Sequence, residues 1–248
     1  MNPKTLAIIP ARYAAERLPG KPLLRDTGLT LIEHCWRRVR EARRIDAVLI
    51  ATDDARILDA ARAFGADAVL TSPACRSGTD RVAEAAAGRQ DLALVINLQG
   101  DEPEVDSAAL DRLVDRMGRD DAPMGTIACP FRDPAAAADP NRVKVAVDRR
   151  GRALYFSRSL IPYRRDPASA AAPLLHIGVY AYRPDFLAAV ATLPTTPLES
   201  AEKLEQLRVL EHGFPIAVEV VQTDPWAGID TRADYEAFVT RWRAAHPR

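Results

Sequence analysis

The loop that follows the first apolar run of the chain carries three cations within ten residues, namely Arg12, Arg17 and Lys21. Positioned arginine and lysine side chains neutralise the charge that spreads over phosphate oxygens when a nucleotidyl group is transferred. Two prolines stiffen this loop, and Gly20 lets the backbone approach a ligand closely. The spacing differs from the G-x4-GK[ST] pattern of a P-loop. We therefore expect a loop that binds the phosphates of a nucleoside triphosphate, although an ordinary basic surface loop is the simpler interpretation of the three cations taken alone.

Two carboxylates stand where a divalent cation could bind. Asp101 lies in the segment QGDEP after the apolar run at residues 92–98, and Asp230 lies in the segment GIDT before the last predicted helix. Carboxylate oxygens are the ligands that Mg²⁺ prefers, usually one or two of them together with phosphate oxygens and waters. The pair predicts a Mg²⁺ cofactor. For Asp230 taken alone, a place near the N-cap of a helix is the simpler interpretation.

Ser77, Gly78 and Arg81 belong to the segment SGTDR, which is typical of a helix start. The free backbone N–H groups of a helix start bind anions or base edges, but the same residues also form a capping sequence that needs no ligand. His176 and Tyr180 are four positions apart, so on a strand they point the same way. A lone histidine in such a place is more often a structural hydrogen-bonding residue than a catalyst.

A predicted helix at residues 198–211 carries several acidic side chains and Arg208. At i,i+3 and i,i+4 spacing, such charges normally form the solvated face of a helix. By default we assign the glutamates and the arginine of this helix to its solvated face: Glu199, Glu202, Glu205, Glu211 and Arg208.

The elements that must position these residues alternate along the first half of the chain. Three nearly continuous apolar runs are typical of parallel strands buried on both faces, and helical patterns lie between them. This alternation predicts an α/β fold with a doubly wound, mostly parallel sheet, whose ligands bind beyond the carboxyl ends of the strands. The predicted strands are residues 5–10, 47–52 and 92–98, and the predicted helices are residues 29–42, 55–64 and 79–87.

The second half of the chain is less regular. We interpret it as the rest of the same sheet together with a small strand-rich lobe at about residues 130–185. Because no Gly- or Ser-rich linker divides the sequence, one domain over residues 1–248 is expected. The predicted strands are residues 143–147, 153–156, 175–182 and 216–221, and the predicted helices are residues 198–211 and 233–244.

Composition excludes several classes of function. The 34 basic and 34 acidic residues cancel, so no global positive field attracts nucleic acid or an anionic membrane. The three cysteines are far apart and lack the spacing of a zinc or redox motif, which favours a reducing cytoplasm. The apolar run before Arg12 is shorter than a signal peptide or a membrane span requires, so a cytoplasmic protein is expected.

Nine segments in the same order resemble a known family, the 3-deoxy-manno-octulosonate (KDO) cytidylyltransferases, also called CMP-KDO synthetases. The resemblance runs from Ile8 to about Tyr235 and implies a nucleotide-diphospho-sugar transferase-like, Rossmann-like fold. The segments are IPARYAAERLPGKPL, ATDD, SGTDR, VINLQGDEP, NRVKV, ALYFSR, HIGVYAYR, LEQLRVLE and GIDT.

The resemblance implies that the anomeric hydroxyl of KDO attacks the α-phosphate of CTP, releasing pyrophosphate and giving CMP-KDO for lipopolysaccharide biosynthesis. It implies catalytic roles for Arg12 and Lys21 at the phosphates and for Asp101, with Asp101 and Asp230 binding two Mg²⁺ ions. It also implies a cytoplasmic homodimer with its contact in the strand-rich lobe. The residues implied to bind CTP are Ala11, Arg12, Lys21, Thr52, Ser77 and Gly78, and those implied to bind the sugar are Arg81, Gln99, Arg158, His176, Tyr180, Glu205 and Gln206.

The chain departs from the family pattern at three positions, Ala15, Glu16 and Cys75. Relatives commonly have small hydroxyl residues at the first two and a histidine at the third, and Arg17 has no assigned role. Two other readings stay open. One is a cytidylyltransferase for a sialic-type nonulosonate or an amino-substituted KDO, and the other is a non-catalytic nucleotide-sensing protein on the same fold.

Overall fold

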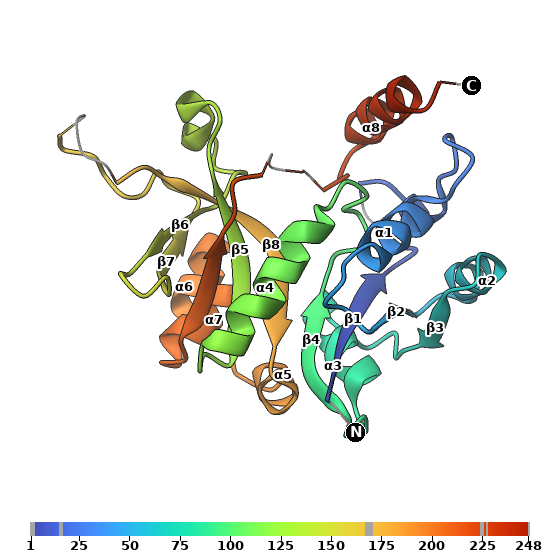
Figure 1. Ribbon diagram of the computed structural model, residues 1–248, viewed down its shortest axis with the longest axis horizontal. Coiled ribbons are helices and arrows are strands. Elements are labelled where there is room, and N and C mark those ends of the chain that lie inside the picture. Colours follow the sequence, from blue (N-terminus) through green and yellow to red (C-terminus); the bar gives the residue numbers. More distant parts are fainter. Residues whose placement is uncertain (1–2, 15–16, 167–170, 224–225, 227, 248) are drawn as a thin grey trace. The chain divides into compact units, whose positions relative to one another are not determined.

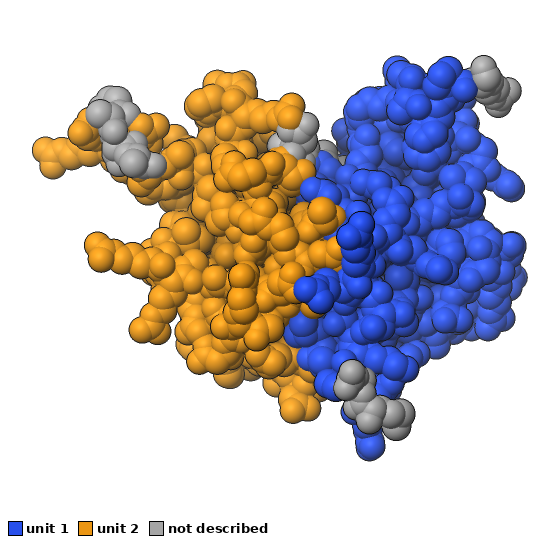
Figure 2. All heavy atoms as spheres, in the orientation of Figure 1, with its two compact units in different colours: residues 1–107, 226–248 blue, residues 108–225 orange. Residues whose placement is uncertain are grey.

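The computed structural model describes residues 3–14, 17–166, 171–223, 226 and 228–247. The chain forms two compact units, Met1–Ser107 with Trp226–Arg248 and Ala108–Pro225, which Figure 2 colours separately. The expected strand-rich lobe at about residues 130–185 falls inside the second unit, which begins earlier and ends later. That the chain acts as one domain stays a prediction.

The first unit contains four parallel strands in the order β3-β2-β1-β4 (Figure 1). β1 and β4 bury Ile8, Ile9 and Ile96 completely, which is why their sequences are continuously apolar. Because β1 lies between β2 and β4, the loops that follow these three strands leave the same edge of the sheet. The strands are β1 (Lys4–Ala11), β2 (Ala47–Thr52), β3 (Asp67–Leu70) and β4 (Leu92–Asn97).

The α-helices of the first unit begin at side-chain caps. Thr30, Asp54, Ser77 and Thr231 each accept a hydrogen bond from a backbone N–H of the helix that they precede. These caps satisfy donors that would otherwise lack partners, so the helices start where the sequence predicts. The helices are α1 (Leu31–Arg40), α2 (Ala55–Ala63), α3 (Gly78–Ala86), α8 (Arg232–Ala245) and the short 3-10 helix η1 (Lys21–Leu23).

Helix α8 packs on the cation-bearing loop through one apolar cluster. Tyr235 and Phe238 of α8 lie in this cluster with Leu18, Leu31 and Ile229, and all five side chains are buried. Leu18 is in the cation-bearing loop, and Ile229 is the neighbour of Asp230. The cluster therefore anchors, in a single core, the two segments that carry the predicted cations and the second predicted metal ligand.

The second unit contains a mixed arrangement of strands. β5 is antiparallel to β8 and parallel to β9, while β6 is antiparallel to β7 and β8. The α/β fold with a mostly parallel sheet is confirmed, and the pairs β5–β8, β6–β7 and β6–β8 are antiparallel. The elements are α4 (Ser107–Arg119), β5 (Met124–Pro130), the 3-10 helix η2 (Pro134–Ala138), β6 (Lys144–Val147), β7 (Ala153–Ser157), β8 (Leu174–Tyr182), α5 (Pro184–Val190), α6 (Pro197–Glu202), α7 (Gln206–Glu211) and β9 (Ile216–Val220).

The helix predicted at residues 198–211 is wrong in two respects. Lys203 adopts a left-handed conformation with φ of 54° and ends α6, so two short helices replace one. Glu199 is 7 % exposed instead of solvated, and Arg208 donates from Nε to its Oε2 over 2.8 Å. The ion pair between the two short helices accounts for the burial of the glutamate, because a buried carboxylate requires a partner.

None of the helices in the described parts of the chain combines the length and the apolar character that crossing a membrane requires.

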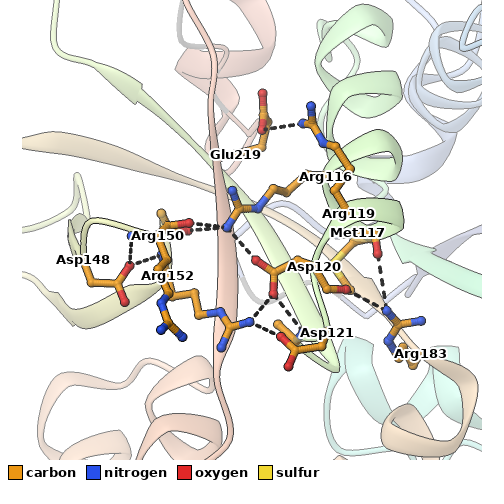
Figure 3. Close-up of polar contacts among 12 residues, drawn as sticks. Arg116, Met117, Arg119, Asp120, Asp121, Asp148, Arg150, Arg152, Arg183 and Glu219 are labelled. Atoms are coloured by element: carbon orange, nitrogen blue, oxygen red, sulfur yellow. Dashed lines mark hydrogen bonds and ion pairs between the residues drawn. The ribbon is translucent and has the colours of Figure 1, made fainter.

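An ion-pair network in the second unit joins α4, the segment between α4 and β5, and the β6–β7 turn (Figure 3). Asp120 is its centre. One carboxylate oxygen accepts from Arg116 over 2.7 Å, and the other accepts from Arg152 over 2.7 Å. Arg152 also pairs with Asp121, whose side chain is 86 % exposed, whereas that of Asp120 is 9 % exposed.

Asp120→Ala is expected to lower the free energy of unfolding by about 3 kcal/mol, because it leaves two arginines without their buried carboxylate. Asp121→Ala is the matched control, and its exposed ion pair is expected to contribute less than about 1 kcal/mol. Urea unfolding of the two variants at neutral pH measures both effects. Equal losses in the two variants would contradict the central role of Asp120.

The pH dependence of this stability has a defined sign. Burial alone would raise the pKa of Asp120, but the N–H of Ala122 and the guanidinium groups of Arg152 and Arg116 together hold that pKa below its usual value. A carboxyl group with a lowered pKa stabilises the fold above its unfolded pKa, and this contribution is lost as the pH falls through its folded pKa. The stability gap between Asp120→Ala and the unsubstituted protein should therefore shrink below about pH 4.

Candidate active site

A pocket of about 180 Å³ lies at the carboxyl ends of β1 and β4 in the first unit. Parallel sheets bind ligands at this edge, so the pocket stands where the sequence predicts chemistry. Six of the predicted site residues line it: Ala11, Arg12, Lys21, Gly78, Gln99 and Asp101.

The backbone of the cation-bearing loop is fixed by its own hydrogen bonds. Gly20 donates to the carbonyl of Tyr13 over 2.9 Å and accepts from Leu23 over 2.9 Å. Its φ of 71° lies in the left-handed region, and a Cβ there would come within 3.2 Å of the Tyr13 hydroxyl. Glycine is therefore required at this turn, which delivers Lys21 to the pocket.

The ammonium of Lys21 is surrounded by oxygens from two other segments. Its Nζ lies 2.6 Å from Oδ2 of Asp101, 2.7 Å from the carbonyl oxygen of Ile229 and 3.7 Å from Oδ1 of Asp230. The N–H of Ile229 donates to the carbonyl of Asp101 over 2.8 Å, which joins the two oxygen-bearing segments. Asp101 and Asp230 therefore both face the place where a single cation sits.

This oxygen set fits a hard divalent cation. Two carboxylates and a backbone carbonyl are ligands that Mg²⁺ accepts, and the ammonium of Lys21 shows that a cation can lie among them. Within the described residues, no third Asp, Glu, His or Cys completes the site. The substrate's phosphates and water would have to supply the remaining ligands. The assignment of Asp101 and Asp230 to a metal remains a prediction.

Arg17 and Arg12 have different partners. Arg17 pairs with Oδ1 of Asp230 over 3.0 Å, and both side chains are largely exposed. Arg12 donates to the carbonyl oxygen of Cys75 over 2.7 Å, so the segment before α3 orients it beside the pocket. The departures at Ala15 and Glu16 lie outside the described residues.

The Cys75 thiol, the third departure from the family pattern, donates to Oε2 of Glu84 over 3.1 Å. Burial and this carboxylate raise the pKa of Cys75 to about 11, so the thiol is neutral near pH 7. Cys75 therefore acts here as a neutral hydrogen-bond donor.

The predicted cytidine-binding residues Thr52 and Ser77 also have structural roles. The Thr52 hydroxyl accepts from the N–H of Asp54 over 3.2 Å. Ser77 and Asp80 form a capping box, in which each side chain accepts from the backbone N–H of the other. The capping interpretation of SGTDR is therefore correct, and a ligand role for the same segment stays a prediction.

Arg81 is a predicted sugar ligand with protein partners of its own. Its side chain is 0 % exposed, donating to Oδ2 of Asp53 over 2.6 Å and to the hydroxyl of Thr71. These bonds tie α3 to the segments that follow β2 and β3. The structure thus gives Arg81 a positioning role, and its contact with a sugar remains untested.

Gln99 and Gly100 form the floor of the pocket with β1. Gln99 donates to Oδ1 of Asn97 over 3.2 Å. A Cβ on Gly100 would lie 2.9 Å from the carbonyl oxygen of Pro10, which is closer than real side chains allow. Glycine is required there because the strand ends approach so closely.

The other predicted sugar ligands lie in the second unit. On β8 the rings of His176 and Tyr180 are 5.6 Å apart, so these two residues share a face as predicted. Arg158 donates from its backbone N–H to Oε2 of Glu202 over 2.8 Å and from Nε to the Glu202 carbonyl over 2.6 Å. Glu205 is exposed just before α7, while Gln206, the first residue of that helix, is 4 % exposed.

Comparison with known proteins settles the family. A model of the cytidylyltransferase family matches residues 6–219. A 3-deoxy-manno-octulosonate cytidylyltransferase of Myxococcus xanthus is 49 % identical over 97 % of both chains, and one of Syntrophotalea carbinolica is 48 % identical over 92 % of this chain and 94 % of its own. The chain belongs to the 3-deoxy-manno-octulosonate cytidylyltransferase family.

A solved structure agrees with this KDO cytidylyltransferase membership. The structure of CMP:2-keto-3-deoxy-manno-octonic acid synthetase complexed with CTP superposes with a TM-score of 0.92 and is 40 % identical. The superposition covers 98 % of this chain and 99 % of that one. The resemblance inferred from nine sequence segments is confirmed.

Sequence reasoning did not single out Glu102, a buried carboxyl group next to Asp101 in this KDO cytidylyltransferase. Burial and the neighbouring Asp101 raise the pKa of Glu102 to about 8. The indole N–H of Trp226 donates to its Oε2 over 3.1 Å. The only sequence signal was its place directly after Asp101 in QGDEP.

Proposed function

We propose that the protein transfers the cytidylyl group of CTP to 3-deoxy-D-manno-octulosonate, releasing pyrophosphate and forming CMP-KDO for lipopolysaccharide biosynthesis. The observation that carries the proposal is the pocket at the strand ends, where Arg12 and Lys21 meet Asp101. It stands in a chain that matches, over 98 % of its length, a synthetase complexed with CTP.

The two cations supply the charge that the reaction requires. A nucleotidyl transfer develops negative charge on the pyrophosphate that leaves, and preorganised cations beside it stabilise the transition state. Arg12 is already oriented by the Cys75 carbonyl, so it needs little reorganisation. Lys21 is held by Asp101 and Ile229, and it becomes available to phosphate once another cation satisfies these oxygens.

Asp101 and Asp230 would hold Mg²⁺ in this proposal. A bound Mg²⁺ neutralises phosphate charge and lowers the pKa of a bound hydroxyl. With its pKa lowered in this way, the sugar hydroxyl would not need a general base, and the proposed mechanism includes none. The carbonyl of Ile229, which already faces Lys21, is a further candidate ligand.

The residues that bind the cytidine and those that bind the sugar are assigned by their chemistry. Backbone and small side chains at Ala11, Thr52, Ser77 and Gly78 suit the cytidine, while polar side chains suit a sugar with several hydroxyls and a carboxylate. The proposed sugar ligands are Arg81, Gln99, Arg158, His176, Tyr180, Glu205 and Gln206.

We also propose a cytoplasmic homodimer. Three large apolar side chains between residues 130 and 185 are well exposed, namely Leu154 at 63 %, Leu160 at 49 % and Tyr163 at 87 %. We place the proposed contact in the strand-rich lobe, where it would cover such side chains. The cysteines Cys35, Cys75 and Cys129 are all unpaired, which suits a reducing compartment.

A pyrophosphate-release assay tests the activity. The protein is incubated with CTP, Mg²⁺ and, in separate reactions, KDO, an amino-substituted KDO and a sialate. Release is expected with KDO and to depend on CTP and on the sugar together. No release with any sugar would contradict the enzymatic function. Release only with the sialate or the amino sugar would show that this sugar, and not KDO, is the substrate.

A further inference from the structure

The hydroxyl of Thr126 lies inside a distortion of the β5–β8 pair. Thr126 pairs with Tyr180 while its neighbour Ile127 pairs with Ile177, so Gly178 and Val179 form a bulge in β8. The Thr126 side chain is 0 % exposed. Its Oγ1 lies 2.8 Å from the carbonyl oxygen of Val179, 3.2 Å from that of Ile177 and 3.0 Å from Nε2 of His176.

The hydrogen atoms of this cluster can be assigned by counting donors. Both carbonyl oxygens only accept, so the single hydrogen of the Thr126 hydroxyl belongs on one of them, with Val179 the nearer. If this hydrogen pointed toward His176, neither of the contacts between Oγ1 and the two carbonyl oxygens would contain a donor. Leaving buried polar groups without a hydrogen bond is costly. Nε2 of His176 must therefore carry a hydrogen and donate it to Oγ1 of Thr126.

The opposite side of the imidazole ring is then an acceptor. A neutral ring protonated at Nε2 has a lone pair at Nδ1. Within the described part of the chain, Nδ1 of His176 makes no hydrogen bond. Phe156 stands edge-on to the ring at 5.0 Å and Tyr180 lies at 5.6 Å, so the ring plane is held from two sides. Burial also lowers the pKa of His176 to about 3, which keeps the ring neutral near pH 7.

We propose that Thr126 is a positioning residue that fixes His176 as the neutral Nε2-protonated tautomer, so that Nδ1 accepts a hydrogen bond from a sugar hydroxyl. The choice of sugar rests on the proposed function, whereas the tautomer rests on the contacts within β5 and β8. A neutral acceptor cannot bind a carboxylate. His176 therefore binds a hydroxyl group of the sugar, and the carboxylate of the sugar must be bound by cations elsewhere.

Nitrogen-15 NMR of the ligand-free protein tests the tautomer without any activity. With ¹⁵N-labelled histidine, and His176→Gln to assign the resonances, His176 is expected to show a protonated Nε2 and an unprotonated Nδ1 from pH 5 to 8. Thr126→Val, which keeps the shape of the side chain, should produce a tautomer mixture, and Thr126→Ser should preserve the original signature. A protonated Nδ1 or a charged ring in the unsubstituted protein would overturn the proposal, as would an unchanged signature in Thr126→Val.

Steady-state kinetics test the contact with the sugar. Thr126→Val is expected to raise the KM for KDO on the order of tenfold, the effect of one lost hydrogen bond, and to leave the KM for CTP within about twofold. Thr126→Ser should restore the KM for KDO. An unchanged KM for KDO in Thr126→Val would overturn the hydroxyl contact. If the unsubstituted protein turns over no sugar, the proposed function fails, and the NMR result still decides the tautomer independently.

Discussion

Asp101→Asn is expected to lower the turnover number at least on the order of a hundredfold while leaving the fold intact. Losing a charge contact that acts in the transition state costs about 3 kcal/mol, and each 1.36 kcal/mol is a factor of ten. The asparagine still offers an oxygen to Lys21, and the hydrogen bond from Ile229 uses the backbone carbonyl of residue 101. The defect should therefore appear in catalysis and not in stability.

The measurement combines pyrophosphate release with thermal unfolding. Asp59→Asn is the matched control, because it makes the same charge change on the exposed face of α2. Asp59→Asn should retain full turnover. A rate for Asp101→Asn close to that of the control would remove Asp101 from the proposed metal site.

Lys21→Met is expected to have two effects of opposite direction. The first is a fall in kcat/KM on the order of a hundredfold, because the cation proposed to stabilise the leaving pyrophosphate is lost. The second is tighter binding of a divalent cation by the nucleotide-free protein, since the ammonium that competes for Asp101 is gone. We expect that gain to be on the order of tenfold, which corresponds to about 1.4 kcal/mol.

Binding of Mn²⁺, followed by electron paramagnetic resonance, measures the second effect without turnover. Lys4→Met, at an exposed ion pair with Asp91, is the control, and its Mn²⁺ affinity should not change. Weaker Mn²⁺ binding by Lys21→Met would show that the lysine supports the cation site instead of competing for it.

Much of the first unit could be predicted from the sequence because its signals are local. β1, β2 and β4 are continuous apolar runs, and their helices carry caps and periodic apolar faces. Strand β3 was not predicted because it is short and its four residues are exposed or half-exposed, and β5 was not predicted because it contains a glycine and a proline. Helix α4 was overlooked although Leu110, Leu113 and Met117 mark its buried face.

Side-chain partners could not be predicted in the same way. Lys21 and Asp101 are eighty positions apart, and only the folded sheet brings the two side chains within 2.6 Å. The burial of Arg81 depends on Asp53 and Thr71 at the ends of other elements, and that of Glu199 on Arg208 in the next helix. Periodicity places Glu199 and Arg208 on a solvated face, because it contains no information on distant partners.

Gly100 limits how this site could be redesigned. Gly100 and Pro10 of β1 line the floor of the pocket, and a Cβ on Gly100 would collide with the carbonyl oxygen of Pro10. Altered substrate choice must therefore come from the side walls, whose residues project from loops and helix starts. A mutant library aimed at new substrates should leave residue 100 unchanged, because any side chain there would displace the backbone of β1.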